Sequence, residues 1–437
     1  MKKLSYITFM LISAFIGQKA ARASGDLYNF DDSIDLKALA SLEIKSGKTN
    51  DAATLEKPYL IIVSLDGFRH DYPTLHNAKN IQAMMREGSY VRRLIPAFPS
   101  ITFPNHYTIA TGMYPEHTGL VGNTMYSREK DALYQIRDSK AVRDGHWYNG
   151  TPLWSLAERQ GMLSASFFWV GSEATEPLTP PSYYFRYNNK VPYTLREQQV
   201  EKWLELPEKE RPHLIFLYYS ITDSSGHIYG PESQETHDAV QYVDARIGML
   251  RKYIKQSKLP INLIVTADHG MANSTNTYNV HDYVDLASNR FITLGPVAMI
   301  YTENPQEKQR IYTELLKQEK FDAYLDTNVP EYLNFKNKDR IGDIVLITRE
   351  PDMIDYVATG EKSSLERLKG DHGYDPYRYP NMSAIFVAEG PNIQSGLALA
   401  PTENIHIYPF VAKILGLKVT DPIDGRLEKL APMLKQK

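Results

Sequence analysis

Cysteine is absent from all 437 residues of the chain. This absence excludes disulfide bonds, thiolate nucleophiles and thiolate metal ligands. Any transition-metal site must therefore use His, Asp and Glu, a set of ligands that favours hard or borderline ions such as zinc.

Long charged runs and long apolar runs are also scarce. The 49 basic and 52 acidic residues give a formal net charge of −3 without an extended basic segment, so no nucleic-acid-binding surface is evident. Beyond the first 23 residues, no apolar run is long enough for a membrane span. The hydrophobic fraction of 42% is typical of globular proteins, and the length fits one large α/β unit with insertions.

The first 23 residues have the pattern of a secretory signal peptide. Lys2 and Lys3 precede a mostly apolar stretch over residues 4–16, and Ala21-Arg22-Ala23 offers a small-x-small cleavage signal. Cleavage after Ala23 predicts an exported protein, periplasmic or secreted, and no Cys is present there for a lipoprotein anchor. A short buried helix is the alternative interpretation.

From Pro58 onward, short β-branched runs alternate with stretches of helical spacing. Strands are expected at residues 59–65, 163–169, 213–220, 261–267 and 384–388, and helices at residues 74–88, 195–206, 232–256 and 404–415. This alternation predicts an α/β fold with a mainly parallel sheet that is covered by helices on both faces.

The chain divides into one large domain and smaller flanking parts. Residues 24–57 are polar and lack periodicity, which predicts a flexible lead-in before a domain over residues 58–425. A small inserted subdomain is expected at about 296–371, and residues 426–437 are expected to form a C-terminal tail. The expected elements of the subdomain are strands at 297–302 and 343–349 and a charged helix at 306–318.

Acidic and imidazole side chains follow three of the expected strands. Asp66 comes directly after the first strand, Asp223 lies within a few residues of another, and Asp268 and His269 come directly after a third. In such sheets the chemistry lies just past the carboxyl ends of the strands. One such Asp is often a turn residue, but three of them, two with a nearby His, indicate a shared site.

Two further histidines complete a set of metal ligands. His227 lies four residues after Asp223, and His372 lies in a second Asp-His-Gly sequence. The six side chains are enough for two ions if a further group joins one of them. Thr102 is the candidate, because a metal and the start of a helix at 105–112 would both favour its alkoxide form as a nucleophile. In the alternative interpretation, Thr102 only caps that helix.

The segments ITFPNHYTIATGMYPEHTG and TDSSGH resemble the nucleotide pyrophosphatase/phosphodiesterase family of the alkaline phosphatase superfamily, and the similarity extends over about residues 58–417. The resemblance implies an alkaline-phosphatase-like fold, a catalytic phosphodiesterase domain over residues 58–425, and two Zn²⁺ per chain bridged by the reacting phosphoryl group. On one ion it places Asp223, His227 and His372. On the other it places Asp66, Asp268, His269 and the Thr102 hydroxyl.

The resemblance also implies a reaction and a small-molecule nucleotide as the partner. Thr102 attacks phosphorus, water cleaves the resulting phosphothreonine, and a nucleoside 5′-monophosphate is released from a phosphodiester or pyrophosphate. Asn123 matches a family residue that hydrogen-bonds a phosphate oxygen during catalysis, and its alternative is a turn residue. Phe103 and Tyr218 match positions of a slot that stacks the nucleobase, and Tyr187 is a candidate third. Ordinary packing is the alternative for these aromatic residues.

Three other functions stay open at this point. Phosphomonoesterases of the same superfamily resemble this chain in their metals but add positive side chains or a third metal, and residues 161–182 contain no Lys or Arg. A phosphodiesterase for choline or glycerol phospholipid headgroups would place carboxylates and aromatic rings around the choline cation. A metal-stabilised binding protein without activity is disfavoured by the complete ligand set. The remaining histidines, His106 among them, are expected to be structural or exposed, and the physiological nucleotide, the metal in vivo and the oligomeric state are left open.

Overall fold

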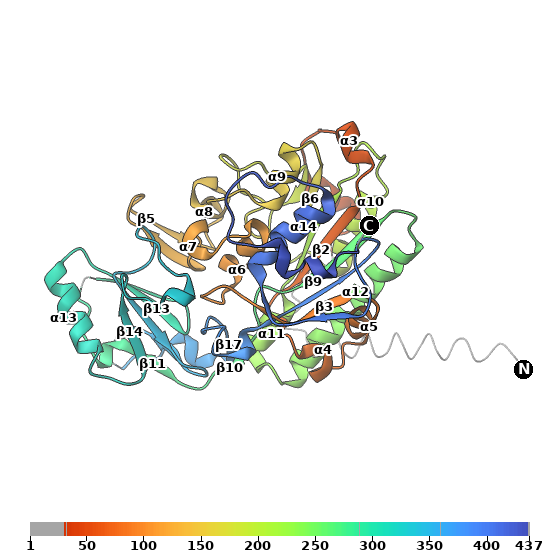
Figure 1. Ribbon diagram of the computed structural model, residues 1–437. Coiled ribbons are helices and arrows are strands. Elements are labelled where there is room, and N and C mark those ends of the chain that lie inside the picture. The colour runs from red at the N-terminus through yellow and green to blue at the C-terminus, as the bar shows by residue number, and fades with distance from the viewer. Residues whose placement is uncertain (1–29, 32, 288, 359, 436–437) are drawn as a thin grey trace, which may run out of the picture.

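A ten-stranded sheet forms the centre of the larger part of the molecule (Figure 1). The computed structural model describes residues 30–31, 33–287, 289–358 and 360–435. The strand order is β1-β7-β6-β8-β2-β9-β18-β3-β19, and β20 also pairs with β3. The strands are β1 (Ile44–Lys45), β2 (Tyr59–Leu65), β3 (Ser89–Ile95), β6 (Ser164–Phe167), β7 (Tyr183–Phe185), β8 (Leu214–Tyr219), β9 (Ile261–Thr266), β18 (Ala384–Glu389), β19 (Leu397–Leu399) and β20 (Thr402–Glu403).

The central strands lie where the sequence predicts them. β2 matches the predicted strand, and β6, β8, β9 and β18 differ from the predicted runs by at most two residues at either end. β7, β6, β8, β2 and β9 are parallel, whereas β18 is antiparallel to both of its neighbours. Every residue of β2, β8 and β9 is buried, because a parallel strand covered on both faces has no side toward solvent.

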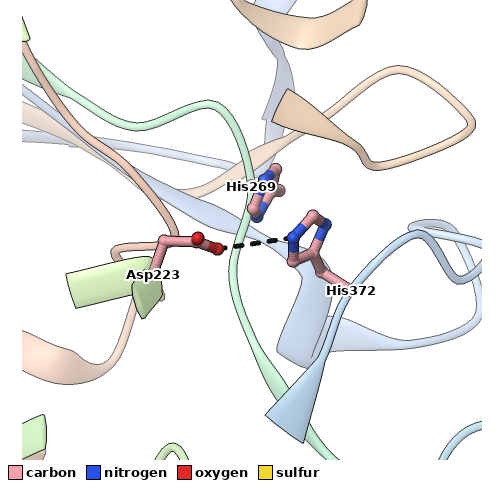
Figure 2. A group of neighbouring side chains, drawn as sticks. All are labelled: Asp223, His269 and His372. Carbon is pink, nitrogen blue, oxygen red and sulfur yellow. Dashed lines mark ion pairs between the residues drawn. The ribbon is translucent and has the colours of Figure 1, made fainter. Parts of the chain in front are cut away.

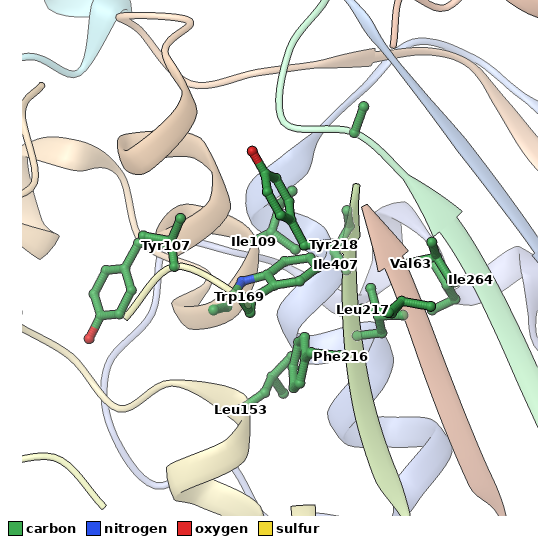
Figure 3. Packing of buried hydrophobic residues seen from close by; sticks show 14 of the residues in the cluster. Val63, Tyr107, Ile109, Leu153, Trp169, Phe216, Leu217, Tyr218, Ile264 and Ile407 are labelled. Carbon is green, nitrogen blue, oxygen red and sulfur yellow. The ribbon is translucent and has the colours of Figure 1, made fainter. Parts of the chain in front are cut away.

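Helices cover both faces of the sheet. Phe216 of β8 packs against Trp154 with ring centroids 5.5 Å apart, and against Trp169 at 4.9 Å (Figure 3). Tyr219, on the opposite face of the same strand, donates its hydroxyl to Glu197 over 2.9 Å. The first face carries α6 (Thr102–Thr111), α9 (Leu153–Arg159) and α14 (Ile407–Leu415), and the second carries α5 (Lys79–Glu87), α10 (Tyr193–Leu204), α11 (Ile221–Tyr229) and α12 (Gln234–Gln256).

One expected helix is broken. The helix predicted at residues 74–88 consists of α4 (Tyr72–Leu75) and α5, separated around Asn77, whose φ is 54°. Asparagine adopts this left-handed conformation more readily than other non-glycine residues, so it interrupts a spacing that looks continuous in the sequence. The other helices expected in the main domain are observed as α10, α12 and α14, with ends that differ from the predicted ones by at most three residues.

A smaller unit lies to the left of the main sheet in Figure 1. Its four-stranded antiparallel sheet, in the order β12-β13-β15-β14, packs with α13 around a separate apolar core. Its elements are β12 (Arg290–Thr293), β13 (Val297–Tyr301), α13 (Pro305–Leu315), β14 (Phe321–Leu325) and β15 (Ile344–Thr348). The unit begins before residue 296, because β12 pairs with β13, and β11 (Thr277–Asn279) pairs with β16 (Met353–Asp355).

The segment before the first central strand belongs to the main sheet. Its described part contains α2 (Leu36–Leu42), β1 and α3 (Ala52–Leu55), and β1 pairs with β7 at the sheet edge. The expectation of a loose lead-in is corrected here, since a two-residue strand leaves no periodicity in the sequence. The predicted signal peptide, residues 1–23, lies outside the described residues. Within the described part of the chain, no helix is long and apolar enough to cross a membrane.

Candidate active site

The predicted ligands meet where the parallel strands end. Asp66 follows β2, Asp268 and His269 follow β9, and Asp223 lies in the first turn of α11 after β8. Gly67 has a φ of 65°, and a Cβ atom there would lie 2.9 Å from the Cα of Asp223. Glycine therefore allows α11 to approach the turn after β2 this closely.

His372 reaches the same place from far along the chain. It follows β17 (Gly370–Asp371), which pairs with β10 (Ala272–Asn273) just beyond the turn after β9. Figure 2 shows Asp223, His269 and His372 facing one another, and one ligand atom from each lies within 4.8 Å of the other two. The structure thus brings the predicted ligands of both ions into one cluster.

Three of these ligand atoms form a nearly regular triangle. The Nε2 atoms of His227 and His372 each lie 3.3 Å from Asp223 Oδ1, and 3.1 Å from each other. A tetrahedral zinc ion with bonds of about 2.0–2.1 Å holds neighbouring ligand atoms about 3.3 Å apart. The triangle therefore has the size of one face of a zinc coordination tetrahedron.

A second set surrounds His269. Its Nε2 atom lies 2.9 Å from Asp268 Oδ2, 3.6 Å from Asp66 Oδ1 and 3.2 Å from the Thr102 hydroxyl. Thr102 is the first helical residue of α6, and Ile101 takes the N-cap position, so the interpretation of Thr102 as a helix cap is wrong. The Thr102 hydroxyl faces the second set at the positive end of the helix dipole.

Three carboxylate oxygens of the two sets are buried without a hydrogen-bond donor from the described residues: Asp66 Oδ1, Asp223 Oδ1 and Asp268 Oδ2. Burial and repulsion from Asp268 and Asp223 raise the pKa of Asp66 well above its usual value. Buried carboxylates without a counter-charge are costly. Two divalent cations between these oxygens would remove that cost, and the oxygen and nitrogen donors suit zinc.

Backbone carbonyls determine which nitrogen each histidine presents. The Nδ1 atoms of three rings lie close to carbonyl oxygens: His227 at 2.9 Å from Gly370, His269 at 2.8 Å from Gly270, and His372 at 3.0 Å from Ser100. Donation of the Nδ1 proton to a carbonyl leaves the Nε2 lone pair for a metal. The three rings are thus oriented as ligands by the surrounding backbone.

His106 is buried in α6 and holds the first turn of this helix in place. Its Nδ1 atom lies 2.9 Å from the Thr102 carbonyl oxygen, and its Nε2 atom lies 2.8 Å from Ser64 Oγ of β2. The Nδ1 atom is also 3.3 Å from Asp268 Oδ2. His106 is therefore structural, as expected, and it connects Thr102 to the second set.

Asp371 is a titratable residue of the site that the sequence interpretation missed. It forms a further candidate metal group with His227 and His372, and its Oδ1 accepts the backbone N–H of His372 over 2.9 Å. The available signal was the second Asp-His-Gly sequence, in which only the histidine was considered as a ligand.

A cavity of about 940 Å³ opens from the two ligand sets toward the surface. Thr102 lines it together with all four predicted substrate residues, Phe103, Asn123, Tyr187 and Tyr218. Asn123 Oδ1 accepts the Phe103 backbone N–H over 3.0 Å. The Nδ2 group of the same Asn123 side chain stays available to donate a hydrogen bond to a ligand oxygen beside Thr102.

One side of the cavity is an aromatic wall formed by Phe168, Tyr187 and Tyr218. Ring centroids lie 5.2 Å apart between Phe168 and Tyr187, and 6.4 Å apart between Tyr187 and Tyr218. Tyr218 is 8% exposed and donates its hydroxyl to Asp66, whereas Tyr187 is 51% exposed. Phe168, which the sequence interpretation missed, has a φ of 74°, a strained conformation for a bulky residue and one that clusters at functional sites.

A buried arginine supports the aromatic wall from behind. Arg196 of α10 is 1% exposed, and its guanidinium carbon lies 4.1 Å from the ring centroid of Tyr193 and 5.0 Å from that of Phe168. Its Nη1 atom donates to the carbonyl oxygen of Tyr218. Because the planar guanidinium can stack on rings and donate at the same time, Arg196 links Phe168 to Tyr218.

Three more arginines, also missed, line the outer part of the cavity: Arg137, Arg143 and Arg186. Arg137 follows β5 (Ala132–Gln135), the second strand of a hairpin with β4 (Thr124–Ser127), Arg143 ends α8 (Ser139–Arg143), and Arg186 follows β7. They lie outside residues 161–182, the segment that contains no Lys or Arg. Their separation along the chain hides the cluster in the sequence.

Comparison with known proteins agrees with this fold. The sequence model of the family described as type I phosphodiesterase / nucleotide pyrophosphatase matches residues 60–375. Venom phosphodiesterase CdcPDE of Crotalus durissus collilineatus is 34% identical over 410 residues, covering 89% of this chain and 48% of that protein. Human ectonucleotide pyrophosphatase/phosphodiesterase family member 1 is 34% identical over 400 residues, covering 88% and 42%. The chain spans about half the length of the curated relatives it matches.

Solved structures match this chain over their whole length. Murine ectonucleotide pyrophosphatase/phosphodiesterase 5 superimposes with a TM-score of 0.80 at 28% identity, covering 86% of this chain and 100% of that one. An inactive variant of the same protein in complex with AMP gives a TM-score of 0.81 over 87% and 100%. The fold is therefore that of an alkaline-phosphatase-like α/β protein: helices cover both faces of the sheet, and the candidate site lies at the carboxyl ends of its parallel strands. Within that class, the chain belongs to the type I phosphodiesterase / nucleotide pyrophosphatase family, which confirms the family predicted from the sequence.

Proposed function

We propose that this chain is a two-metal phosphodiesterase and pyrophosphatase that cleaves nucleotides through a phosphothreonine at Thr102 and releases a nucleoside 5′-monophosphate. The observation that carries the proposal is the place of Thr102, whose hydroxyl lies 3.2 Å from His269 Nε2 at the inner end of a cavity lined by aromatic rings. The relatives named above as phosphodiesterases, and the AMP complex of an inactive threonine-to-alanine variant, support a nucleotide substrate.

The two ligand sets would hold two zinc ions. Asp223, His227 and His372 would hold one ion, and Asp66, Asp268, His269 and the Thr102 hydroxyl the other. When bound, the two cations stabilise charge on the attacking and leaving oxygens of an in-line displacement at phosphorus.

The chain's own residues perform the remaining tasks. Thr102 Oγ1 forms a bond to phosphorus while the bond to the leaving oxygen breaks, and water then cleaves the ester and restores the Thr102 hydroxyl. Asn123 donates from Nδ2 to a phosphate oxygen as negative charge develops on it. Phe103 and the aromatic wall hold the base, since aromatic faces stack any base with little selectivity.

The outer part of the cavity disfavours a choline headgroup as the substrate. A choline cation would be bound by aromatic rings and carboxylates, but among the described residues three arginines and one carboxylate, Glu173, lie there. Positive charge in this part of the cavity would repel the choline cation.

A matched panel of substrates tests the proposal. We expect the purified protein to hydrolyse ATP, a dinucleotide and an aryl phosphodiester, with much slower hydrolysis of glycerophosphocholine and of an aryl phosphomonoester. Chelation should abolish the activity and lower the melting temperature, because the ions stabilise the folded state by mass action, and added zinc should restore both. Equal rates on the monoester and the diester, or full activity in the chelated protein, would reject the proposal.

We also propose that the protein is exported. The signal-peptide pattern supports this, as do the names of the venom and ectonucleotide relatives. N-terminal sequencing of the mature protein should begin at Ser24, and an intact Met1 in active protein recovered from the cytoplasm would contradict export.

A further inference from the structure

The outer end of the cavity carries unbalanced positive charge. Arg137, Arg143 and Arg186 line it together with Glu173, a carboxylate that interacts electrostatically with Arg143 and Arg186. Within the described residues, none of the three guanidinium groups makes an ion pair with a carboxylate. Arg143 donates to Ser139 Oγ over 3.2 Å, and Arg137 has no hydrogen bond to another described residue.

Other arginines of the chain show the usual arrangement. Arg246 lies 2.9 Å from Glu197, and Arg251 lies 2.7 Å from Glu389. Three arginines and one carboxylate, Glu173, leave a net charge of about two positive units among the described side chains at this end of the cavity. Exposed cations need no partner in water, but their convergence on one cavity next to a phosphate-processing site favours binding of an anion.

Contacts along the chain show where these arginines lie relative to the substrate residues. The backbone N–H of Ile136 donates to the Asn123 carbonyl oxygen over 3.1 Å, so Arg137 lies beside the residue proposed to hold the reacting phosphate. Glu173 accepts the Tyr187 backbone N–H over 3.3 Å, and Arg186 directly precedes Tyr187. Arg137 and Arg186 therefore lie next to the two ends of the interval between Asn123 and Tyr187, and Arg143 lines the same cavity. The sugar of a stacked nucleotide would lie in this interval.

We propose that this arginine cluster binds a second phosphate group, attached to the ribose of the stacked nucleotide, so that the enzyme acts preferentially on ribose-phosphorylated nucleotides. The inference rests on the proposed function, because it takes the aromatic wall as the base site and the two ligand sets as the site of the cleaved phosphate. Arginine suits this role, because its planar fork of donors matches a phosphate group.

Two pairs of substrates isolate the second phosphate. NADP⁺ differs from NAD⁺ only by a 2′-phosphate, and coenzyme A differs from dephospho-coenzyme A only by a 3′-phosphate. Both members of a pair are cleaved at the same pyrophosphate. We expect kcat/KM to be higher for at least one phosphorylated member, and the preference to fall as the salt concentration rises.

Substitution of the arginines gives the decisive comparison. In the triple variant Arg137→Gln, Arg143→Gln, Arg186→Gln, the preference should fall about 10-fold, the scale of a lost charge-assisted hydrogen bond. Hydrolysis of NAD⁺ and of an aryl phosphodiester should change less than about 3-fold, since these substrates lack the second phosphate. Among the single variants, Arg137→Gln should have a large effect, and Arg86→Gln, an exposed arginine of α5 outside the cavity, should have none.

Binding provides a readout that does not depend on turnover. Adenosine 3′,5′-bisphosphate or adenosine 2′,5′-bisphosphate should bind the wild-type protein more tightly than AMP by calorimetry, and the triple variant should bind them equally. The inference would be overturned if the wild-type protein and the triple variant showed the same preference for the phosphorylated substrates and the same affinity for the bisphosphates, even with diester hydrolysis intact. Absence of all diester hydrolysis would instead reject the proposed function, and the calorimetric comparison would still decide the role of the arginines.

Discussion

The two ends of the cavity are built differently. At the inner end, Asp66, Asp268 and His269 are at most 1% exposed, and a backbone carbonyl orients each histidine predicted to be a ligand. At the outer end, Tyr187 is 51% exposed, and Arg137 and Arg186 are exposed side chains without ion pairs in the described structure. The side chains of the inner end are thus buried and fixed in one arrangement, whereas the outer end has exposed polar side chains that are accessible to a ligand.

This difference follows from the elements that supply each end. The ligands of the inner end follow β2, β8, β9 and β17, whose positions are held by the sheets. The outer end comes from the segments after β5, β6 and β7 and from α8. Loop segments tolerate changes in sequence more readily than strands, so we expect the reaction to depend on the inner end and the choice of nucleotide to depend on the outer end.

The largest expected effect is at the inner end. Thr102→Ala should lower kcat for every substrate by about three orders of magnitude or more, because the nucleophile is lost. Bound zinc, measured by elemental analysis, should stay nearly unchanged, since each ion keeps three other ligands. Thr102→Ser, which retains a hydroxyl, is the matched control and should keep a substantial part of the activity. Wild-type rates in the alanine variant would remove Thr102 from the mechanism and with it the contrast between the two ends.

The two ends also differ in how far they could be predicted from the sequence. Asp66, Asp268 and His269 directly follow recognisable strand runs, so the inner end could be assembled from sequence order and the rule that such sheets are functional at their carboxyl edge. His372 was found through the second Asp-His-Gly sequence and Thr102 through its place before an expected helix. The resemblance then assigned each of them to one of the two ions. Asp371 was missed beside His372 although it repeats the pattern of Asp268.

The outer end could be predicted only in part. Tyr187 and Tyr218 were found by resemblance. Phe168 and Arg196 were missed because their role depends on a contact between the residue after β6 and α10, and neither segment shows this contact in its sequence. The arginines come from three separate segments, and each resembles an ordinary surface residue in the sequence. At the sheet edge, β1 was missed for a similar reason, since two residues are too few to show alternation.

Substitution of Arg196, which supports the aromatic wall from behind, is expected to reduce activity less than Thr102→Ala. In Arg196→Met, the link between Phe168 and the Tyr218 carbonyl oxygen is lost while the side chain keeps much of its apolar volume. The aromatic wall should loosen, and KM for nucleotide substrates should rise about 10-fold, within the range measured for base–aromatic stacking. For an aryl phosphodiester with no nucleobase, kcat should change less than about 3-fold, because the ligand sets are untouched.

Arg196→Lys keeps the charge but not the planar fork, so it should recover only part of the loss. If Arg196 is purely structural, its substitution should lower the melting temperature and reduce kcat/KM for the nucleotide and the aryl phosphodiester equally. That outcome would mean that the aromatic wall and the two ligand sets form one rigid unit rather than two separable parts of the cavity.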